Sequence, residues 1–249
     1  MSTSTRSILR IGGDDRTSFL QGILTNDALK LNDDKIQFAA LLSPQGKILH
    51  DMFLVARDNA ILIDSDAAFA DTLKKRLAMY KLRAKITIEE VSHEISVRYD
   101  PNGLPDPRHP ALPHRLYSNI RTDEPSTHDS RLTTHDSLHL GIPELGRDFA
   151  PDSVVAMDAG YDLLHAISFT KGCYVGQEVT ARMHYKNIAR RGFYLLTHDT
   201  MPPRLALLKF EEVEAANGVA TVDNIPYRAA LPSWMQPKLA AFKTANEKQ

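Results

Sequence analysis

The chain has 249 residues, of which 43% are apolar and 24% charged, and it can therefore bury a full hydrophobic core. Its formal net charge of −1 argues against nucleic acid or an anionic membrane covering most of its surface, and leaves only a local basic patch for such contacts. No apolar run approaches the ~20 residues that cross a bilayer, and the amino terminus lacks the apolar stretch of a secretory signal. The one cysteine, Cys173, cannot form an internal disulfide, so we expect a reducing compartment, the cytoplasm.

The first part of the chain alternates short apolar strands with two amphipathic helices. The first helix follows Asp14 or Asp15 as its cap and places Phe19, Leu20 and Ile23 on one face. The second covers residues 67–80, where apolar side chains recur at helical spacing. The pattern predicts strands at residues 7–11, 36–42, 47–56, 60–64, 85–91 and 93–99. Helices interleaved with antiparallel hairpins indicate an α+β fold.

The composition changes between residues 101 and 125, which hold six of the fourteen prolines. Because proline interrupts regular structure, we interpret this stretch as a long surface loop. Beyond it, the pattern predicts a strand at residues 137–142, a loop at 143–151, and helices at 161–169 and 175–185. A strand at residues 191–197 begins a last, β-rich section.

The run KGCYVGQE, residues 171–178, is the most unusual stretch. Two glycines flank the thiol of Cys173, so that the backbone can turn sharply there. Lys171 and the start of the following helix would both favour the thiolate. Gln177 and Glu178 offer an amide and a carboxylate that suit a heterocycle. The residues alone leave open a second interpretation, in which Cys173 is a buried structural cysteine in a glycine-rich turn.

This run resembles the signature of the YgfZ family of folate-binding proteins. These are relatives of the glycine-cleavage aminomethyltransferase, and their mitochondrial members assist the maturation of iron–sulfur proteins. Four further segments resemble the family in the same order: residues 19–27 (FLQGILTND), 43–48 (SPQGKI), 106–108 (DPR) and 141–144 (GIPE). The last part of the chain matches poorly, and it is short for the carboxy-terminal β-barrel of the family.

The resemblance implies an aminomethyltransferase-like folate-binding fold. Two α+β lobes would surround a central channel that holds the folate, with a small β-rich module at the carboxyl end. We expect the first lobe at residues 1–92, the second lobe with the KGCYVGQE run at 93–190, and the module at 191–249.

The function that the resemblance implies is that of a tetrahydrofolate-binding accessory protein for the assembly or repair of iron–sulfur enzymes. Tetrahydrofolate, or a one-carbon derivative, would be the cofactor, and iron–sulfur client or assembly proteins would be the partners. Cys173 would be the reactive group. The residues expected at the folate are Asn26, Lys171, Tyr174, Gln177, Glu178 and Arg182.

A rival function from the same resemblance is that of a folate-dependent one-carbon transferase or demethylase. In the related aminomethyltransferase, an aspartate just after the SPQGK-like turn lies near the reactive folate nitrogen. Asp51 occupies a matching place here, after His50, and a carboxylate there could handle a proton. An acidic residue on a strand is more commonly a solvated surface group, which leaves the role of Asp51 open.

The chain turns basic after Glu178, with no acidic residue until Asp199. If the helix continues, Arg182, Lys186 and Arg190 share one face. Such a face could hold the glutamate tail of a folate, could be a solvated edge, or could contact RNA.

Metal ligands are sparse in the sequence. His135 and His139 have the spacing of a helical zinc pair but lack further ligands nearby, and one cysteine cannot hold a cluster alone. We therefore expect no resident metal, no membrane contact, and no more than a local contact with nucleic acid.

Overall fold

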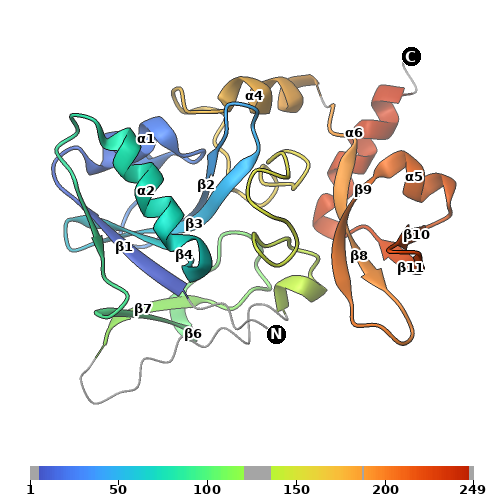
Figure 1. The fold of residues 1–249 in the computed structure, drawn as a ribbon, viewed down its shortest axis with the longest axis horizontal. Coiled ribbons are helices and arrows are strands. Elements are labelled where there is room, and N and C mark those ends of the chain that lie inside the picture. Colours follow the sequence, from blue (N-terminus) through green and yellow to red (C-terminus); the bar gives the residue numbers. More distant parts are fainter. Residues whose placement is uncertain (1–5, 121–135, 187, 247–249) are drawn as a thin grey trace. The chain divides into compact units, whose positions relative to one another are not determined.

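The computed structural model describes residues 6–120, 136–186 and 188–246, which form two compact units. The first unit comprises the described residues of 1–42, 49–134 and 164–175, and the second those of 43–48, 135–163 and 176–249. Both combine strands and helices (Figure 1). The expected division at residues 92 and 190 remains a prediction.

A five-stranded sheet forms the centre of the first unit, with strand order β2-β3-β4-β1-β5. β1 pairs antiparallel with both β4 and β5, and β3 pairs antiparallel with β4. Asp58 and Asn59 join β3 to β4 with φ angles of 49° and 59°, the left-handed turn geometry that these two residue types tolerate. The strands are β1 (Arg6–Gly12), β2 (Ile36–Leu42), β3 (Ile48–Arg57), β4 (Ala60–Asp66) and β5 (Thr87–Glu90).

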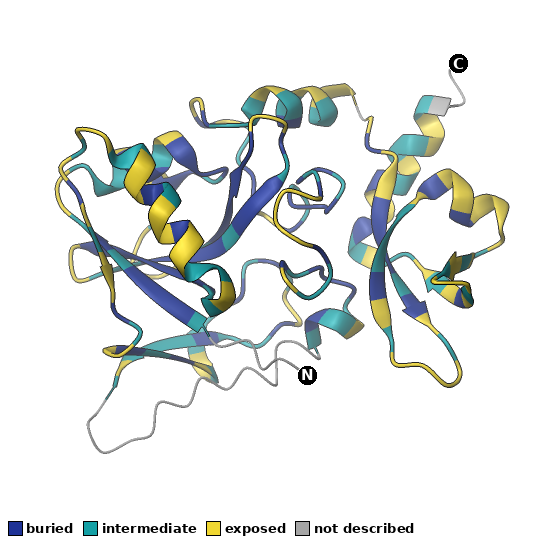
Figure 2. Ribbon diagram, viewed as in Figure 1, coloured by how far each residue is buried: buried dark blue, intermediate teal, exposed yellow. Residues whose placement is uncertain are grey.

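Two helices, α1 (Arg16–Ile23) and α2 (Ala70–Lys81), bury apolar side chains in the core of this sheet (Figure 2). Leu20 of α1 and Leu73 and Leu77 of α2 are fully buried there. Asp15 precedes α1 as predicted but does not cap it with its side chain, because its carboxylate accepts the Lys85 N–H at 2.7 Å instead. Short 3₁₀ helices follow α1 (Ala28–Lys30) and precede α2 (Ala67–Phe69).

The proline-rich stretch is not a continuous surface loop, and that prediction is wrong for its described part. β6 (Ile95–Leu104) and β7 (Arg115–Asn119) form an antiparallel ribbon there. Between the strands, Asp106 and Arg108 are buried. Proline disfavours helices and central strands, but it is compatible with a two-stranded ribbon whose connecting loop is held by ion pairs. The proline content alone therefore gave the wrong prediction for this stretch. Residues 121–125 lie outside the described residues.

Two further predictions fail around residue 150. Residues 136–139 are helical, although the pattern favoured a strand at 137–142. Residues 161–169 form turns without helix, and His165 has a φ of 58°. The carbonyls of His165 and Ala166 accept hydrogen bonds from the side chains of Asn26 and Thr25, which takes the place of helical pairing.

The second unit contains helix α4 (Gln177–Lys186) and a four-stranded sheet of order β10-β11-β8-β9. The sheet and helices α5 and α6 bury one apolar cluster, whose members include Tyr194, Phe210 and Tyr227. The expected β-rich module is thus mixed in structure. Its elements are β8 (Arg191–Thr197), β9 (Arg204–Lys209), α5 (Phe210–Ala215), β10 (Val219–Val222), β11 (Ile225–Ala230), a 3₁₀ helix (Ser233–Met235) and α6 (Gln236–Asn246). Of the described helices, none is long and apolar enough to cross a membrane.

Candidate functional site

Lys171, the first residue of the KGCYVGQE run, is a buried anchor. Its ammonium group donates to the carbonyls of Gln21 at 2.7 Å and Asn26 at 3.0 Å, and also to that of Leu24. The carbonyls of Gln21 and Leu24 lie at the carboxyl end of α1, where carbonyls lack helical partners and a cation is favourable, and that of Asn26 lies just beyond it. Burial lowers the pKa of Lys171 to about 8, and the charge of Asp27 opposes this shift. All three ammonium protons are used, so Lys171 has none left for a folate.

Tyr174 is the second anchor, and the thiol lies between the two. The Tyr174 side chain is buried, and the Lys171 ammonium lies 5.0 Å from its ring centroid. Gly172 and Cys173, between these anchors, are exposed. The interpretation of Cys173 as a buried structural cysteine is therefore wrong. The run holds its ends in the protein and presents the thiol to solvent.

Asn26, predicted to contact the folate, is engaged by the backbone. Its amide donates to the carbonyls of Phe38 at 2.7 Å and His165 at 2.8 Å, and its side-chain oxygen accepts the Asp27 N–H at 2.8 Å. Both amide protons are thus used. Asn26 joins the segment after α1 to the segment that leads into the KGCYVGQE run.

The sequence did not predict the role of the buried Thr25, which connects the same two segments as Asn26. Its hydroxyl donates to the Ala166 carbonyl at 2.6 Å and accepts the Ala40 N–H at 2.8 Å. The Thr25 carbonyl accepts the Ser168 N–H at 3.0 Å. The only signal for this role was the position of Thr25 inside the family-like run of residues 19–27.

Helix α4 continues the run and begins at Gln177, two residues later than predicted. Gly176 has a φ of 82°, which is non-helical, and its carbonyl accepts both the N–H and the hydroxyl of Thr180 at 3.3 and 2.9 Å. Gln177 is half-buried and Glu178 exposed in the first turn. An acidic residue is favourable there because helix N–H groups point toward it.

The predicted turn at residues 43–46 lies in the second unit and packs against α4. The Gly46 N–H donates to the Ser43 carbonyl at 2.9 Å, which closes the turn, and Gly46 has a φ of 76°. A Cβ atom on Gly46 would lie 3.3 Å from the side chain of Val179. Both the backbone angle and the close approach therefore favour glycine in this SPQG turn.

The predicted basic face holds only in part. α4 ends at Lys186, so Arg190 does not extend the face that Arg182 and Lys186 share. Arg182 and Lys186 are exposed. Within the described part of the chain, the side chains of Gln177, Glu178, Arg182 and Lys186 have neither a hydrogen bond nor an ion pair.

His50 and Asp51 occupy successive positions of β3 and so point to opposite faces of the sheet. His50 is buried, and burial, assisted by the charge of Arg76, lowers its pKa to about 4. It is therefore neutral at physiological pH. Asp51 is half-buried. Its proposed part in proton transfer remains a prediction.

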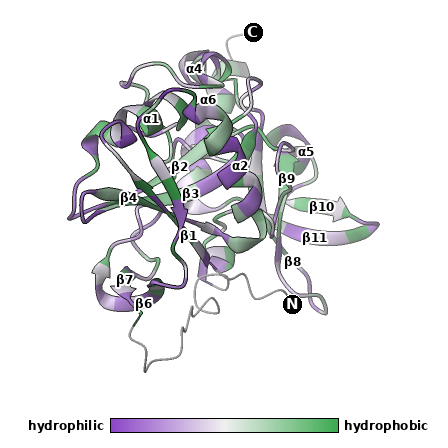
Figure 3. Ribbon diagram, turned by 60° about the vertical axis from the view of Figure 1, so that its left-hand side comes forward, coloured by the Kyte–Doolittle hydropathy of each residue, from purple (hydrophilic) through white to green (hydrophobic). Residues whose placement is uncertain are grey.

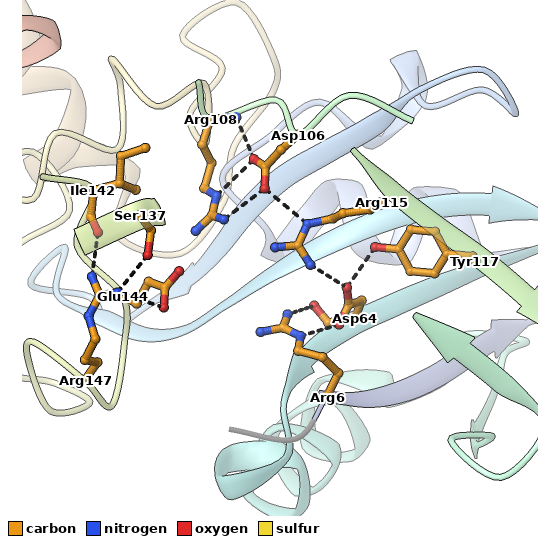
Figure 4. Close-up of polar contacts among 10 residues, drawn as sticks. All are labelled: Arg6, Asp64, Asp106, Arg108, Arg115, Tyr117, Ser137, Ile142, Glu144 and Arg147. Atoms are coloured by element: carbon orange, nitrogen blue, oxygen red, sulfur yellow. Dashed lines mark hydrogen bonds and ion pairs between the residues drawn. The ribbon is translucent and has the colours of Figure 1, made fainter. Parts of the chain in front are cut away.

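A buried ion network in the first unit was not foreseen (Figure 4). Asp64 pairs with Arg6 at 2.6 Å and with Arg115 at 3.3 Å, and Asp106 pairs with Arg115 at 3.1 Å and Arg108 at 2.9 Å. The two arginines hold the pKa of Asp106 well below its usual range, although burial opposes this. The DPR segment thus has a structural role, since its two charges neutralise each other inside the protein.

Of the groups predicted to hold a folate, those on α4 keep their polar atoms available: Gln177 and Glu178 carry an amide and a carboxylate, and Arg182 and Lys186 carry two cations. Asn26 and Lys171 do not fit this role, because their polar hydrogens are already used. In the described part of the chain, no group of three or more His, Cys, Asp or Glu could hold a metal, and His135 lies outside that part.

The crystal structure of glycine cleavage system aminomethyltransferase T from Bartonella henselae matches 93% of this chain and 84% of that chain, with a TM-score of 0.67 and 13% identity. The chain has the aminomethyltransferase fold. The predicted α+β class is thereby confirmed.

Several curated proteins that are similar in sequence are named iron-sulfur cluster assembly factor IBA57, mitochondrial, or its homolog. The chain is 28% identical to the protein of Neurospora crassa, with 76% of this chain and 51% of that protein covered. Identity to the human protein is 28%, with 76% and 63% covered, and to that of Mycosarcoma maydis 26%, with 87% and 66% covered. The chain thus spans between half and two thirds of these relatives. No family model matches it.

The names of these relatives contradict the expected cytoplasmic location, because they are mitochondrial. That expectation depended on one cysteine and the lack of a secretory signal. Neither feature separates one reducing compartment from another.

Proposed function

We propose that this chain is an accessory factor for the assembly or repair of iron–sulfur proteins, that it binds tetrahydrofolate, and that it acts in the mitochondrion. The observation that carries the proposal is its similarity, over 76–87% of its length, to relatives named as mitochondrial iron–sulfur cluster assembly factors. The aminomethyltransferase fold is compatible with a folate ligand.

Cys173 is the proposed reactive group. Its thiol is exposed on a short loop, and the loop ends are held by Lys171 and Tyr174. A resting iron–sulfur cluster usually takes four protein thiolates, and this chain supplies one. We therefore expect Cys173 to contact a cluster or a client protein transiently, with the other ligands coming from the partner.

The proposed folate contacts come mainly from α4. Gln177 and Glu178 offer a donor and acceptors for the pterin, and Arg182 and Lys186 offer two cations for the glutamate tail. If these cations hold the tail, polyglutamylated folate should bind more tightly than the monoglutamate. An equal affinity for the two folates would indicate that Arg182 and Lys186 are solvated surface residues without a role in binding the tail. A steep salt dependence of RNA binding would instead favour an RNA contact.

The assembly role is tested in human cells that lack their own relative, with this chain directed to mitochondria by an added targeting segment. Activities of iron–sulfur enzymes and of a cluster-free mitochondrial enzyme are measured in the same extracts. Restoration of the iron–sulfur enzymes, with the cluster-free enzyme unchanged throughout, supports the proposal. No restoration at matched protein level contradicts it.

A second candidate is a folate-dependent one-carbon transferase, which the half-buried Asp51 on β3 and the fold favour. The purified chain would then convert tetrahydrofolate to a one-carbon derivative in the presence of a methyl or aminomethyl donor. Asp51→Asn should abolish this turnover. Binding of tetrahydrofolate without turnover would exclude the transferase and keep the assembly role.

A further inference from the structure

Helix α2 and the loop after it carry a concentrated positive charge. Residues 74–85 contain six basic side chains and no acidic one, in a chain whose formal net charge is −1. Most of these side chains are exposed, and hydrophilic and hydrophobic residues both lie along α2 (Figures 2 and 3). We call this surface the α2 basic patch; its cations are Lys74, Lys75, Arg76, Lys81, Arg83 and Lys85.

Two large apolar side chains protrude from the same surface. Met79 is 75% exposed and Leu82 is 88% exposed, the latter more than any other large apolar residue in the described part of the chain. Single exposed apolar residues are common, but here two lie three positions apart among six cations. Cations around protruding apolar side chains form an amphipathic surface.

The patch is held rigidly by the fold. Leu73 and Leu77 are fully buried and fix the opposite face of α2 in the core. The following loop is tied to the start of α1, because the Lys85 N–H donates to the Asp15 carboxylate at 2.7 Å. Leu82 has a φ of 43°, a left-handed angle that turns the chain sharply at the end of the helix.

Acidic groups adjoin the patch, and one of them interacts with it at long range: burial raises the pKa of Glu90, hydrogen bonds from Ser92 lower it, and the charge of Lys74 adds to the net lowering. On β5, Glu89 pairs with Arg10 at 3.8 Å, and Glu90 lies 3.8 Å from His93. Asp71, in the first turn of α2, is the acid that precedes the patch. Throughout the described residues, none of the six cations has an ion pair of its own.

Against the sequence-based expectation of no membrane contact, we propose that the α2 basic patch docks the protein on an anionic lipid bilayer, with Met79 and Leu82 entering the headgroup region. Clusters of four to eight Lys and Arg on an amphipathic surface are typical of contact with anionic lipid, where each cation contributes to binding. Lysine, which makes up four of the six cations, is depleted in protein interfaces. Nucleic acid would use the cations but not the protruding apolar side chains.

The experiment measures sedimentation of the whole chain with vesicles of pure phosphatidylcholine or of phosphatidylcholine with phosphatidylglycerol. We expect binding only to the anionic vesicles, and binding that weakens as salt rises. Lys74→Gln/Lys75→Gln should reduce the partition coefficient at low salt by about 25-fold, since each cation near such a surface contributes roughly fivefold. Met79→Ser and Leu82→Ser should each weaken binding with no change in net charge.

The matched control is Lys35→Gln/Arg228→Gln, which removes the same charge from exposed positions outside the patch. It should bind like the unaltered chain, and thermal melts of each variant show that it is folded. The proposal is overturned if the anionic vesicles do not bind the chain, or if the control weakens binding as much as the patch variant. It is also overturned if Met79→Ser and Leu82→Ser leave vesicle binding intact while an oligonucleotide displaces the chain from vesicles, because the patch would then be a nucleic-acid surface.

Discussion

The environments of neighbouring side chains differ sharply within the segment that contains Lys171, Cys173 and Tyr174. The first and last are buried, and the thiol between them is exposed. Lys171 fixes the backbone by hydrogen bonds to carbonyls of α1 and of the segment after it, and Tyr174 packs against the Lys171 ammonium, so the position of the thiol is fixed as well. We therefore expect substitution of a buried residue of this motif to lower stability, and substitution of the exposed Cys173 to affect activity alone.

Lys171→Met should lower the free energy of unfolding by about 2–3 kcal/mol, because it leaves carbonyls at the end of α1 without a donor. Methionine keeps the length and apolar stem of lysine. Lys35→Met removes an exposed lysine and should change stability by less than about 0.5 kcal/mol. Urea unfolding of both variants is the measurement, and equal effects would contradict the anchor role.

His50 should make stability fall in mild acid. Its pKa is about 4 in the folded chain and about 6.5 when unfolded, so the unfolded state binds more protons between these values. Stability from the buried neutral ring is complete above about pH 6.5 and declines by roughly 3 kcal/mol as pH falls to 4. His50→Gln should flatten the curve of unfolding free energy against pH in this window. His165→Gln, at an exposed position, should leave the curve unchanged, and a flattening there would refute the assignment.

At the scale of elements, the two glycines of the KGCYVGQE run differ in what they require. Gly176 has a φ of 82° before α4, whereas a Cβ atom on Gly172 would meet no atom within 4 Å. Gly176→Ala should therefore cost about 1–2 kcal/mol and Gly172→Ala almost nothing. Chemical denaturation of the pair tests this, and a larger loss for Gly172→Ala would show that the turn is misassigned.

The buried ion network should stabilise the β6–β7 ribbon strongly. Asp106→Asn leaves Arg108 and Arg115 buried without that carboxylate, and we expect a loss of about 3–5 kcal/mol. Asp223→Asn breaks an exposed pair with Arg204 and should cost at most about 1 kcal/mol. Thermal melts compare the stability of the two variants. If Asp106→Asn loses no more stability than Asp223→Asn, the buried network contributes no more than an exposed ion pair.

Elements with a clear apolar period could be predicted from the sequence to within a residue or two. β1, β2 and β8 are of this kind, because period and turn residues are local signals, whereas α2 begins three residues later than predicted, after the 3₁₀ helix at Ala67–Phe69. Residues 101–120 and 161–169 were misjudged because distant partners set their conformation. Arg115 pairs with Asp64, 51 positions away, and Ala166 accepts from Thr25, 141 positions away.

At the scale of the whole molecule, the contiguous motif predicts where the site lies but not which contacts each of its residues makes. Of the residues expected at the folate, Asn26 and Lys171 have their donors turned to backbone carbonyls. Which groups a side chain satisfies depends on long-range folding, and no spacing rule reports it. Cellular location escaped prediction for another reason, since composition does not distinguish reducing compartments.

Tetrahydrofolate should stabilise the folded chain. A ligand that binds only the native state adds about 2.7 kcal/mol at a hundredfold excess over its Kd, so melts with and without it should separate. Arg182→Gln should reduce the added shift that polyglutamylated folate gives and leave the monoglutamate shift nearly unchanged. Coincident melting curves with and without millimolar tetrahydrofolate would contradict the proposal that the chain binds folate.

The most direct test of the proposed function compares the unaltered chain with Cys173→Ser in human cells that lack their own relative. Because the thiol is exposed, the substitution should leave the melting temperature and the protein level unchanged. We predict that the unaltered chain restores iron–sulfur enzyme activity, that Cys173→Ser does not, and that the activity of the cluster-free enzyme is equal in both. Equal restoration by both chains would contradict Cys173 as the working group, and restoration by neither would contradict the assembly role itself.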